Sequence, residues 1–235
     1  PQGAKAFRDD TGRAARILAE GGPVAASVAP SFAAAFNRWE RHRLPSALRK
    51  LGFSYVGETA IGAYHVAAKT AQIVNDDPDG SHICSACPAA VSYIEAYEPD
   101  LVDRITPVVS PMIAHARHIR DKLGPEVKII FIGPCVAKKA EAERPEIEGL
   151  VDCVLTFREF TEWLEREGID LQALEDSDFD EEPEGDARLF PVEGGSLRTA
   201  RLNADLVNLN NVSVSGFDEL QQAFSAMRED QSPVL

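Results

Sequence analysis

The sequence predicts an α/β fold in which two intertwined lobes carry parallel β-sheets flanked by helices. Two observations support this prediction. Short apolar runs of strand length alternate along the chain with longer segments of helical periodicity, a pattern typical of parallel sheets covered by helices. The order of strand, small-residue and proline turn, and helix also recurs at residues 24–50 and 127–143, which is compatible with two related lobes.

The composition sets limits on size and on partners. With 235 residues, of which 44% are apolar, the chain can bury a sizeable core as one large domain or two tightly joined lobes. A net charge of −14 repels nucleic-acid phosphates and anionic membrane surfaces. The longest apolar stretches are strand-sized, far short of the ~20 residues that cross a bilayer. We therefore expect neither a nucleic-acid nor a membrane partner.

The start of the chain and its cysteines indicate a cellular compartment. Residues 1–7 lack an initiator methionine and the basic-then-apolar layout of a signal peptide. We expect an excised piece of a longer cytoplasmic protein. Four cysteines are too few for a disulfide scaffold, and cytoplasmic thiols stay reduced. The placement of the cysteines is then more informative than their number.

The first third of the chain is predicted to alternate helices with strands. A charged helix is expected at 7–20, and a buried strand at 23–29 follows Gly21-Gly22 because its small and β-branched residues run without interruption. Apolar residues recur at helical spacing from 32 to 51. Pro45 is expected to start a second helix there and Gly52 to end it. A short strand at 53–56 precedes a helix at 61–74.

The middle of the chain continues the alternation. Residues 75–80 form a turn cluster, and a short strand is predicted at 81–85. Helices are predicted at 89–97 and 111–123. The clearest buried strand, at 128–133, is an unbroken apolar run that ends at Gly133-Pro134.

The last third is predicted to be more open. A strand at 151–157 is followed by a charged amphipathic helix at 158–167, which Gly168 stops. Residues 176–186 are acidic and contain proline and glycine, so we expect a solvated loop. A short strand near 189–192, a glycine pair, and a final helix at 217–228 complete the chain.

Three turns share a pattern that suggests a ligand site. Ser31, Cys87 and Cys135 each lie next to a proline and a small residue where a predicted strand leaves its sheet. Carboxyl ends of parallel strands are where open α/β sheets bind ligands. We expect these turns to form the edge of a binding cleft.

The cysteines allow more than one interpretation. Exposed backbone amides at such turns favour the thiolate that binds metal, which makes Cys87 and Cys135 ligand candidates, although free cysteines are also commonly buried as small apolar residues. Cys84 and Cys87 form a C-x-x-C pair, as in a zinc knuckle or a redox dithiol, but no second pair accompanies them. Cys153 lies inside an apolar run and is expected in the core.

Two groups of polar residues are weaker candidates. His115 and His118 share a face of a predicted helix, as metal binding would require, but a solvated or packed helix face is the commoner explanation. Lys138 and Glu141 have salt-bridge spacing, with Lys139 between them. The simplest interpretation of that trio is a solvated helix start.

Together, several segments occur in the order and spacing of one known family. They are Ser-Ala-Cys87-Pro, Ser110-Pro111, Gly-Pro-Cys135-Val-Ala-Lys138-Lys-Ala-Glu141 with Arg144-Pro145, residues 151–156, and Gly194-Gly195. The chain resembles the C-terminal H-cluster domain of the iron-only (FeFe) hydrogenase large subunit over almost its whole length. The block Pro-Cys-x-x-Lys-x-x-Glu is the most specific part of the resemblance.

The resemblance implies a cofactor. In that family four cysteines hold the H-cluster, a cubane 4Fe-4S cluster joined through a cysteine to a diiron centre that carries CO and cyanide. Cys87 and Cys135 would match two cubane ligands, in keeping with the thiolate preference of iron–sulfur clusters. Lys138 would match the lysine that donates a charge-assisted hydrogen bond to a cyanide.

Further site residues are implied by the same resemblance. Ala29, Pro30 and Ser31 would line the diiron pocket, and Ser31 would act with Lys138 at the catalytic centre. The other residues expected to border the cofactor are Pro111, Gly194 and Gly195, the last of these allowing close backbone approach.

Two departures from the family pattern affect the expected activity. The family's T-S-C-C-P reads Cys84-Ser85-Ala86-Cys87-Pro88 here, so Ala86 replaces the thiol that relays protons to the diiron site. Gly133 stands where active enzymes usually have methionine. Both features resemble the sensory branch of the family, in which the domain follows a ferredoxin module and is often joined to signalling domains.

The resemblance also implies missing parts. The motif that supplies the last two cysteine ligands would lie beyond Leu235, and two of four ligands do not hold a cluster tightly. Residues 1–6 resemble the segment directly after the last cysteine of a ferredoxin motif. We expect residues 1–235 to be a partial catalytic-type domain, inactive and incompletely loaded by itself. In the intact protein its partners would be a ferredoxin-like module, H-cluster maturation proteins and fused signalling domains.

Three functions remain open from the sequence. The preferred one is an H-cluster domain that senses hydrogen or slowly interconverts hydrogen with protons and electrons. A non-catalytic iron–sulfur assembly or scaffold protein of the prelamin-recognition-factor type shares the domain and lacks the diiron site. A structural zinc-binding domain would use Cys84, Cys87 and Cys135.

Overall fold

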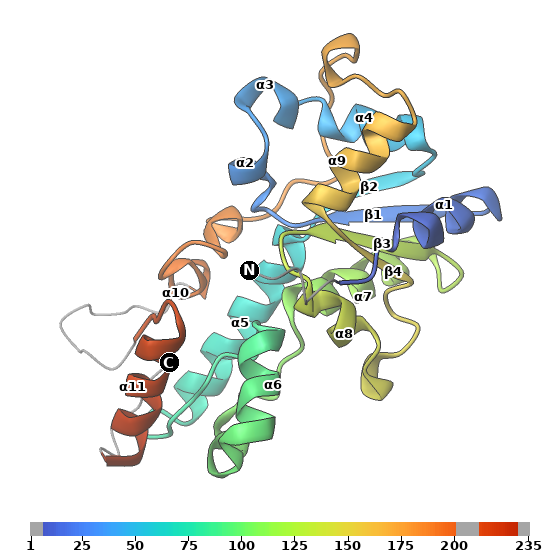
Figure 1. The fold of residues 1–235 in the computed structure, drawn as a ribbon. Helices are drawn as coiled ribbons and strands as arrows, with labels where there is room; N and C mark the ends of the chain where they lie inside the picture. The colour runs from blue at the N-terminus through green and yellow to red at the C-terminus, as the bar shows by residue number, and fades with distance from the viewer. Residues whose placement is uncertain (1–6, 201–211, 230–235) are drawn as a thin grey trace. The chain divides into compact units, whose positions relative to one another are not determined.

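A computed structural model describes residues 7–200 and 212–229 and divides the chain into two compact units (Figure 1). Unit 1 comprises Pro1–Thr59 and His115–Glu182, and unit 2 comprises Ala60–Ala114 and Pro183–Leu235. Each unit is therefore built from two separate stretches of chain. The second unit boundary falls inside helix α7, Pro111–Leu123.

Unit 1 contains a four-stranded parallel sheet with the order β2-β1-β3-β4. Its strands are β1 (Val24–Val28), β2 (Tyr55–Glu58), β3 (Lys128–Gly133) and β4 (Cys153–Thr156). Nearly every strand residue is buried, which is why these segments read as continuous apolar runs instead of alternating ones. The predicted α/β class is confirmed.

Helices cover both faces of this sheet. The His115 side chain of α7 hydrogen-bonds Ser27 of β1 on one face, and α4 and α9 lie on the other face in Figure 1. The helices of unit 1 are α1 (Thr11–Ala19), α2 (Phe32–Ala35), α3 (Arg38–Arg41), α4 (Leu44–Leu51), α8 (Ala137–Ala142) and α9 (Phe157–Arg166), with 3-10 turns η2 (Pro145–Ile147) and η3 (Leu171–Ala173). The core consists of aliphatic and aromatic side chains from the strands, α4 and α9.

Several elements of unit 1 match their predictions closely, and one differs. The strand at 128–133 has the predicted bounds, Pro45 lies in the first turn of α4, and Gly52 ends α4 in the left-handed conformation with φ 112°. Residues 32–51 form three short helices where two were expected. The chain turns extended at Phe36 and Asn37, where Asn37 begins α3 with a capping box.

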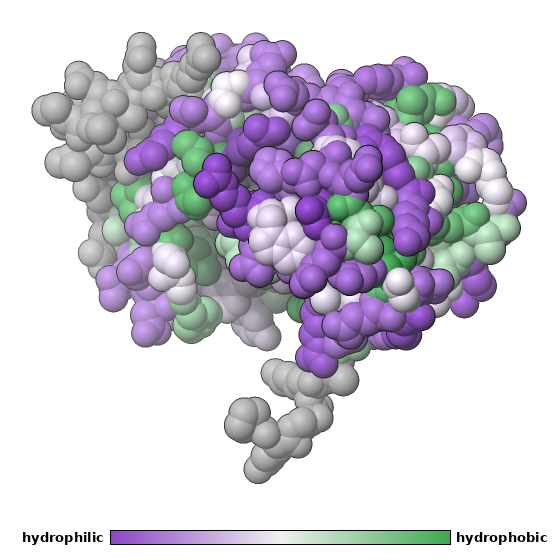
Figure 2. Space-filling model, turned by 90° about the horizontal axis from the view of Figure 1, so that it is seen from above, coloured by the Kyte–Doolittle hydropathy of each residue, from purple (hydrophilic) through white to green (hydrophobic). Residues whose placement is uncertain are grey.

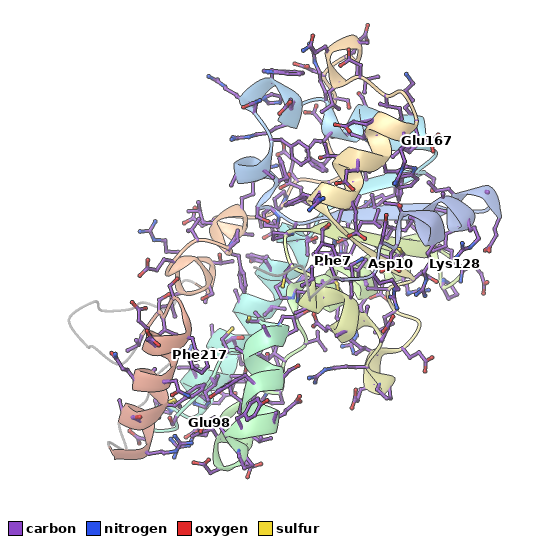
Figure 3. The ribbon with its side chains drawn as sticks, in the orientation of Figure 1. Phe7, Asp10, Glu98, Lys128, Glu167 and Phe217 are labelled. Carbon is purple, nitrogen blue, oxygen red and sulfur yellow. The ribbon has the colours of Figure 1, made fainter. Side chains whose placement is uncertain are left out.

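Unit 2 is helical in the part of the chain that the structure describes. Its helices are α5 (Ala60–Asp76), α6 (Pro88–Tyr97), η1 (Pro99–Arg104), the first turn of α7, η4 (Ala187–Leu189), α10 (Gly195–Ala200) and α11 (Phe217–Glu229). A cluster of Ile94, Leu101, Phe224 and Met227 joins α6, η1 and α11. Phe217, at the start of α11, is labelled in Figure 3 and its ring contacts Tyr93 of α6 at a centroid distance of 5.3 Å.

The predicted second sheet is not found among residues 60–114, 183–200 and 212–229. The strand expected at 81–85 is reduced to a single bridge between Ile83 and Ile105. The strand expected near 189–192 is wrong, because this segment makes a 3-10 turn and a bend instead. In these two segments, Ile83 packs against a hydrophobic cluster, whereas Leu189 and Val192 are exposed. Short runs of this kind do not distinguish a strand from a turn.

The face of the molecule in Figure 2 is largely hydrophilic with small separate hydrophobic patches, in keeping with a net charge of −14. Within residues 7–200 and 212–229, no helix combines the length and the apolar character that a membrane crossing requires.

Candidate functional site

The carboxyl edge of the sheet in unit 1 brings two of the predicted turns together. β1 continues into Ala29-Pro30-Ser31 and β3 into Pro134-Cys135. The Ala29 N–H donates a hydrogen bond to the Ile132 carbonyl at 2.8 Å. A Cβ atom on Gly133 would lie 3.1 Å from that of Ala29. The two turns therefore lie side by side, as expected for neighbouring parallel strands.

Cys135 and Lys138 are placed by the same short segment of this edge. Cys135 is half-buried, and its carbonyl accepts a hydrogen bond from the Lys138 N–H at 3.3 Å at the start of α8. Lys138 Nζ forms an ion pair with Glu141 at 2.7 Å, and the side chains are only 12% and 10% exposed. This is a largely buried pair, so the prediction of a solvated helix start was wrong.

The Ala-Pro-Ser turn is a compact helix entry. Ala29 is buried, and its carbonyl accepts a hydrogen bond from the Phe32 N–H at 2.9 Å. Ser31 adopts a helical conformation directly before α2, and its side chain makes no capping hydrogen bond. The edge thus presents Ala29, Pro30, Ser31, Cys135 and Lys138 within one unit.

Cys87 lies in unit 2 at the start of α6. It is the exposed N-cap residue, with φ −97° and ψ 105°, and Pro88 opens the helix. Its carbonyl accepts the Val91 N–H at 3.0 Å. Cys87 and Cys135 belong to different units.

A cavity of about 770 Å³ adjoins Cys87, and all of its walls belong to unit 2. Cys84, Ala86 and Cys87 form one wall, and the others come from α5, α6, residues 190–200 and residues 212–220. The lining is mainly apolar. Ala86, which the resemblance matches to a proton-relaying thiol, contributes a methyl group to this mainly apolar wall.

The glycine pair has a structural explanation inside unit 2. A Cβ atom on Gly195 would lie 1.7 Å from the Leu189 carbonyl oxygen, so no other residue fits without moving the backbone. Gly194 has φ 66°, and its N–H donates to Ser213 Oγ at 3.2 Å. The expected contact of these glycines with a cofactor stays a prediction.

Pro111 is the first residue of α7 and is half-buried. The Ser110 carbonyl before it accepts the Ala114 N–H at 2.9 Å, whereas the buried Ser110 hydroxyl has no hydrogen-bond partner among the described residues. A buried polar atom of this kind fits a site that receives a ligand. The role of Pro111 beside a cofactor is likewise untested.

The donor set agrees with an iron–sulfur cluster in kind but not in number. Thiolates such as those of Cys87 and Cys135 are the ligands that such clusters prefer. Among residues 7–200 and 212–229, however, no three His, Cys, Asp or Glu side chains are grouped to hold a metal ion. These residues therefore do not form a complete ligand set for a cluster.

The remaining candidates from the sequence are structural. Cys153 is 3% exposed, and burial raises the pKa of its thiol to about 12, which confirms that it belongs to the core. The rings of His115 and His118 lie 6.1 Å apart on α7. His115 Nδ1 is 2.8 Å from Ser27 Oγ, and His118 Nε2 is 2.9 Å from Glu181. They belong to a packed helix face, as preferred from the sequence.

One buried polar cluster was missed. Lys139 Nζ forms ion pairs with Asp10 at 2.8 Å and with Glu159 at 2.7 Å, and Asp10 is labelled in Figure 3. Glu159 also completes a capping box with Thr156. The Thr-x-x-Glu spacing could have indicated the cap, but no sequence signal separates the structural Lys139 from the candidate Lys138.

Comparisons with known proteins agree with this arrangement. Residues 22–233 match the family model described as iron only hydrogenase large subunit, C-terminal domain. The chain is 29% identical over 232 residues to iron hydrogenase 1 of Clostridium pasteurianum, covering 88% of this chain and 40% of that protein. It is 33% identical over 215 residues to the NADP-reducing hydrogenase subunit HndD of Solidesulfovibrio fructosivorans, covering 77% of this chain and 36% of that protein.

Other similarities bear on function and on fold. The cytosolic Fe-S cluster assembly factor NAR1 of Vanderwaltozyma polyspora is 33% identical over 112 residues, covering 47% of this chain. A variant of the [FeFe]-hydrogenase HydA1 from Chlamydomonas reinhardtii has the same fold, with a TM-score of 0.68, 21% identity and coverage of 82% of this chain and 57% of that chain. The chain spans 40% or less of the two hydrogenase relatives.

Proposed function

Because the chain belongs to the family of the iron-only hydrogenase large subunit, C-terminal domain, we propose that it is the cluster-binding domain of a hydrogenase-like protein. In the intact protein it would sense hydrogen or slowly interconvert hydrogen with protons and electrons. The observation that carries the proposal is the family match over residues 22–233. We assign Cys87, Cys135 and Lys138 to cluster binding, and Ala86 to the position of the proton relay, because the motifs around them resemble those of the family.

In this proposal each residue has a limited role. Cys87 and Cys135 would each supply a thiolate to a 4Fe-4S cluster, together with further ligands from the intact protein. Lys138, which pairs with Glu141 at 2.7 Å, would be the charged hydrogen-bond donor to a cyanide of the diiron group. Ala29, Pro30 and Ser31 would border that group. When bound, the H-cluster supplies the redox chemistry of hydrogen.

Ala86 is the reason for preferring sensing or slow turnover. A methyl group neither holds nor transfers a proton, and the cavity wall around it is mainly apolar. General acid–base groups contribute roughly 10²–10⁴-fold to reaction rates. A domain without its proton relay is better suited to reporting hydrogen than to rapid turnover. Electrons would arrive from a ferredoxin-like module, and the output would pass to fused signalling domains.

Infrared spectroscopy tests this proposal. The full-length protein should be matured anaerobically with the H-cluster assembly proteins, and a competent hydrogenase should be matured in parallel as the control. We expect CO and cyanide stretching bands that respond to hydrogen. Iron and sulfide without these bands, in a system that matures the control, would contradict the proposal.

A second candidate is an iron–sulfur assembly or scaffold protein, and the similarity to NAR1 favours it. The same experiment separates the two, because a scaffold would bind iron and sulfide and show no CO or cyanide bands. A structural zinc domain is less favoured, since the described residues hold no group of three metal ligands. Metal analysis of the purified protein would detect stoichiometric zinc if it were correct.

A further inference from the structure

Cys84 has no part in the proposed function. The family pattern has threonine at its position, and the two thiolates assigned to a cluster are those of Cys87 and Cys135. Cys84 nevertheless lies three residues before Cys87, in the same wall of the unit 2 cavity. The pair is therefore a second chemical feature at the candidate site.

The backbone brings the two cysteines within reach of each other. Ser85 and Ala86 form a turn between them. The first and fourth residues of a β-turn have Cα atoms less than about 7 Å apart, and disulfides join Cα atoms about 4.4–6.8 Å apart. Neither cysteine forms a disulfide in this structure. Closure needs no large movement of the chain.

The turn is also held on both sides. The Ile83 N–H donates to the Arg104 carbonyl at 2.7 Å, and the Thr106 N–H donates to the Ile83 carbonyl at 2.9 Å. Ser85 Oγ donates to the Val108 carbonyl at 2.5 Å. On the other side, the Cys87 carbonyl accepts the first hydrogen bond of α6. A fixed turn keeps the two thiols close and raises their effective concentration toward each other.

Both thiols are accessible, unlike the thiol of Cys153. Cys87 is exposed, Cys84 is half-buried, and both border the open cavity of about 770 Å³. Cys153 is 3% exposed in the core of unit 1, where burial raises the pKa of its thiol. Small oxidants can therefore reach the pair while Cys153 serves as an internal reference.

We propose that Cys84 and Cys87 are a redox-sensitive dithiol that closes to a disulfide. In the reaction the Cys87 thiolate attacks a low-molecular-weight disulfide such as oxidised glutathione, and one reduced glutathione leaves. The Cys84 thiolate then attacks the Cys87 sulfur, and the second reduced glutathione leaves. Two protein thiols are oxidised and one small disulfide is reduced to two thiols.

A consequence for cluster loading rests on the proposed function. A sulfur atom bound in a disulfide cannot ligate iron, so closure withdraws Cys87 from the ligand set. The dithiol would then prevent the site from being loaded under oxidising conditions. The disulfide itself is a property of the chain whether or not the chain binds a cluster.

Peptide mapping tests the disulfide. Cleavage after Lys69 and Arg104 gives one tryptic peptide with both cysteines, while Cys135 and Cys153 fall in other peptides. The full chain is equilibrated with oxidised glutathione and about 0.1 mM reduced glutathione, alkylated and analysed by mass spectrometry. With an effective thiol concentration on the order of 1 mM, the closed peptide should exceed the glutathione adduct at Cys87 about 10-fold.

Variants control for the chemistry and for folding. In Cys84→Ser, and in Cys84→Ala as a second variant, the closed peptide is absent and the glutathione adduct accumulates at Cys87. Cys153 stays unmodified in all three proteins. A glutathione adduct at Cys87 that exceeds the closed peptide in the wild-type chain, or a disulfide from Cys87 to Cys135, would overturn the proposal.

A separate measurement distinguishes the two proposals. Reduced and disulfide-closed protein are each incubated with iron and sulfide, and bound iron is measured. We expect the closed form to bind less iron and dithiothreitol to restore it. If the reduced protein takes up no iron although the disulfide forms, the proposed function fails and the dithiol stands. Equal iron uptake by both forms would refute the link between them.

Discussion

At the scale of single residues, the buried charges of unit 1 have the clearest energetic consequences. Lys139 is 8% exposed and lies between the carboxylates of Asp10 and Glu159, which are also buried. The two carboxylates have lowered pKa values although burial opposes ionisation, because hydrogen bonds to Lys139 and other donors outweigh desolvation. Each of the three charges depends on the others.

Lys139→Ala is therefore predicted to be severely destabilising. Removing the lysine leaves two buried carboxylates without their shared cation, a change that costs about 3–5 kcal/mol. Urea denaturation should show a much lower midpoint. The control is Arg158→Ala, which breaks the exposed Arg158–Glu162 pair and should leave the midpoint nearly unchanged. Equal effects of the two substitutions would contradict this account.

Gly195→Ala should also destabilise the protein. The new Cβ would lie 1.7 Å from the Leu189 carbonyl oxygen, so the backbone of α10 or η4 must move. We expect a loss of about 1–3 kcal/mol in thermal or urea denaturation. The matched control is Gly12→Ala in α1, where the nearest atom is 3.9 Å away and alanine should stabilise the helix by about 0.5–1 kcal/mol.

Residue-level prediction from the sequence succeeded where a residue's own neighbours along the chain determine its role. Cys153 lies within an apolar run, and its burial followed from that run. Lys139 differs from Lys138 only in the direction of its side chain around a helix, and its partners lie 129 and 20 residues away. Such long-range pairing has no local signature.

At the scale of elements, the acidic segment 176–186 is a mostly exposed loop, as its composition predicts. What composition did not predict is that two of its carboxylates bind residues of unit 1. Asp180 Oδ2 accepts the Val56 N–H at 2.6 Å, and Glu181 accepts hydrogen bonds from Tyr55, His118 and Lys122. The segment is a strap that runs past the edge strand β2. Composition indicates a loop, but it does not show where the loop binds.

The hydrogen bonds of this strap lead us to expect that the folded protein is less stable in acid. Burial disfavours the charged form of Glu181, but hydrogen bonds from Lys122, His118 and Tyr55 outweigh it and lower its pKa from 4.5 to about 2. A carboxylate whose pKa is lower in the folded protein than in the unfolded chain stabilises the fold at pH values above its unfolded pKa. This stabilisation is lost as the pH falls toward the folded pKa. The free energy of unfolding should therefore fall between pH 4.5 and about 2, by on the order of 1–2 kcal/mol after solvent screening.

Denaturation midpoints measured across that pH range check this prediction. Glu181→Gln should be less stable than wild type at neutral pH, and its midpoint should change less on acidification. Asp178→Asn is the control, because Asp178 belongs to the same strap and has an exposed side chain. An unchanged acid response in Glu181→Gln would show that other carboxylates dominate.

Element boundaries were predictable where caps and breakers mark them. The bounds of α7 and β3 follow from proline at one end and glycine at the other. The failed strand at 189–192 contains a breaker of this kind, Pro191, which should have counted against it. The short run at 81–85 fits a strand or a turn equally well. The conformation of these two segments depends on tertiary packing.

At the scale of the whole molecule, the sheet order predicts which backbone hydrogen bonds are the last to open. β1 and β3 are the two central strands, and both are almost completely buried. Hydrogen–deuterium exchange should show the slowest amides in β1 and β3 and faster exchange in the short edge strand β2 and in α11. Slow exchange confined to α11 would contradict this ranking.

The fold class was predictable, whereas the division of the chain was not. Alternating strands and helices sufficed to predict a parallel sheet with helices on both faces. The sheet order β2-β1-β3-β4 and the absence of a second sheet in the described part of unit 2 depend on which segments meet after long crossovers. The apparent repeat at 24–50 and 127–143 falls within one unit, so it describes two strands of one sheet.

The division of the chain into units also affects how the protein can fold while it is being synthesised. The chain passes from one unit to the other after Thr59, after Ala114 and after Glu182. Within unit 1, Thr59 Oγ1 and His115 Nδ1 both lie 2.8 Å from Ser27 Oγ. The two residues that flank segment 60–114 therefore meet on β1. On a ribosome, residues 60–114 emerge before β3 and β4 exist. Unit 1 is therefore complete in sequence only once Glu182 has been made, when the first part of unit 2 has already emerged, and unit 2 is the last to be completed.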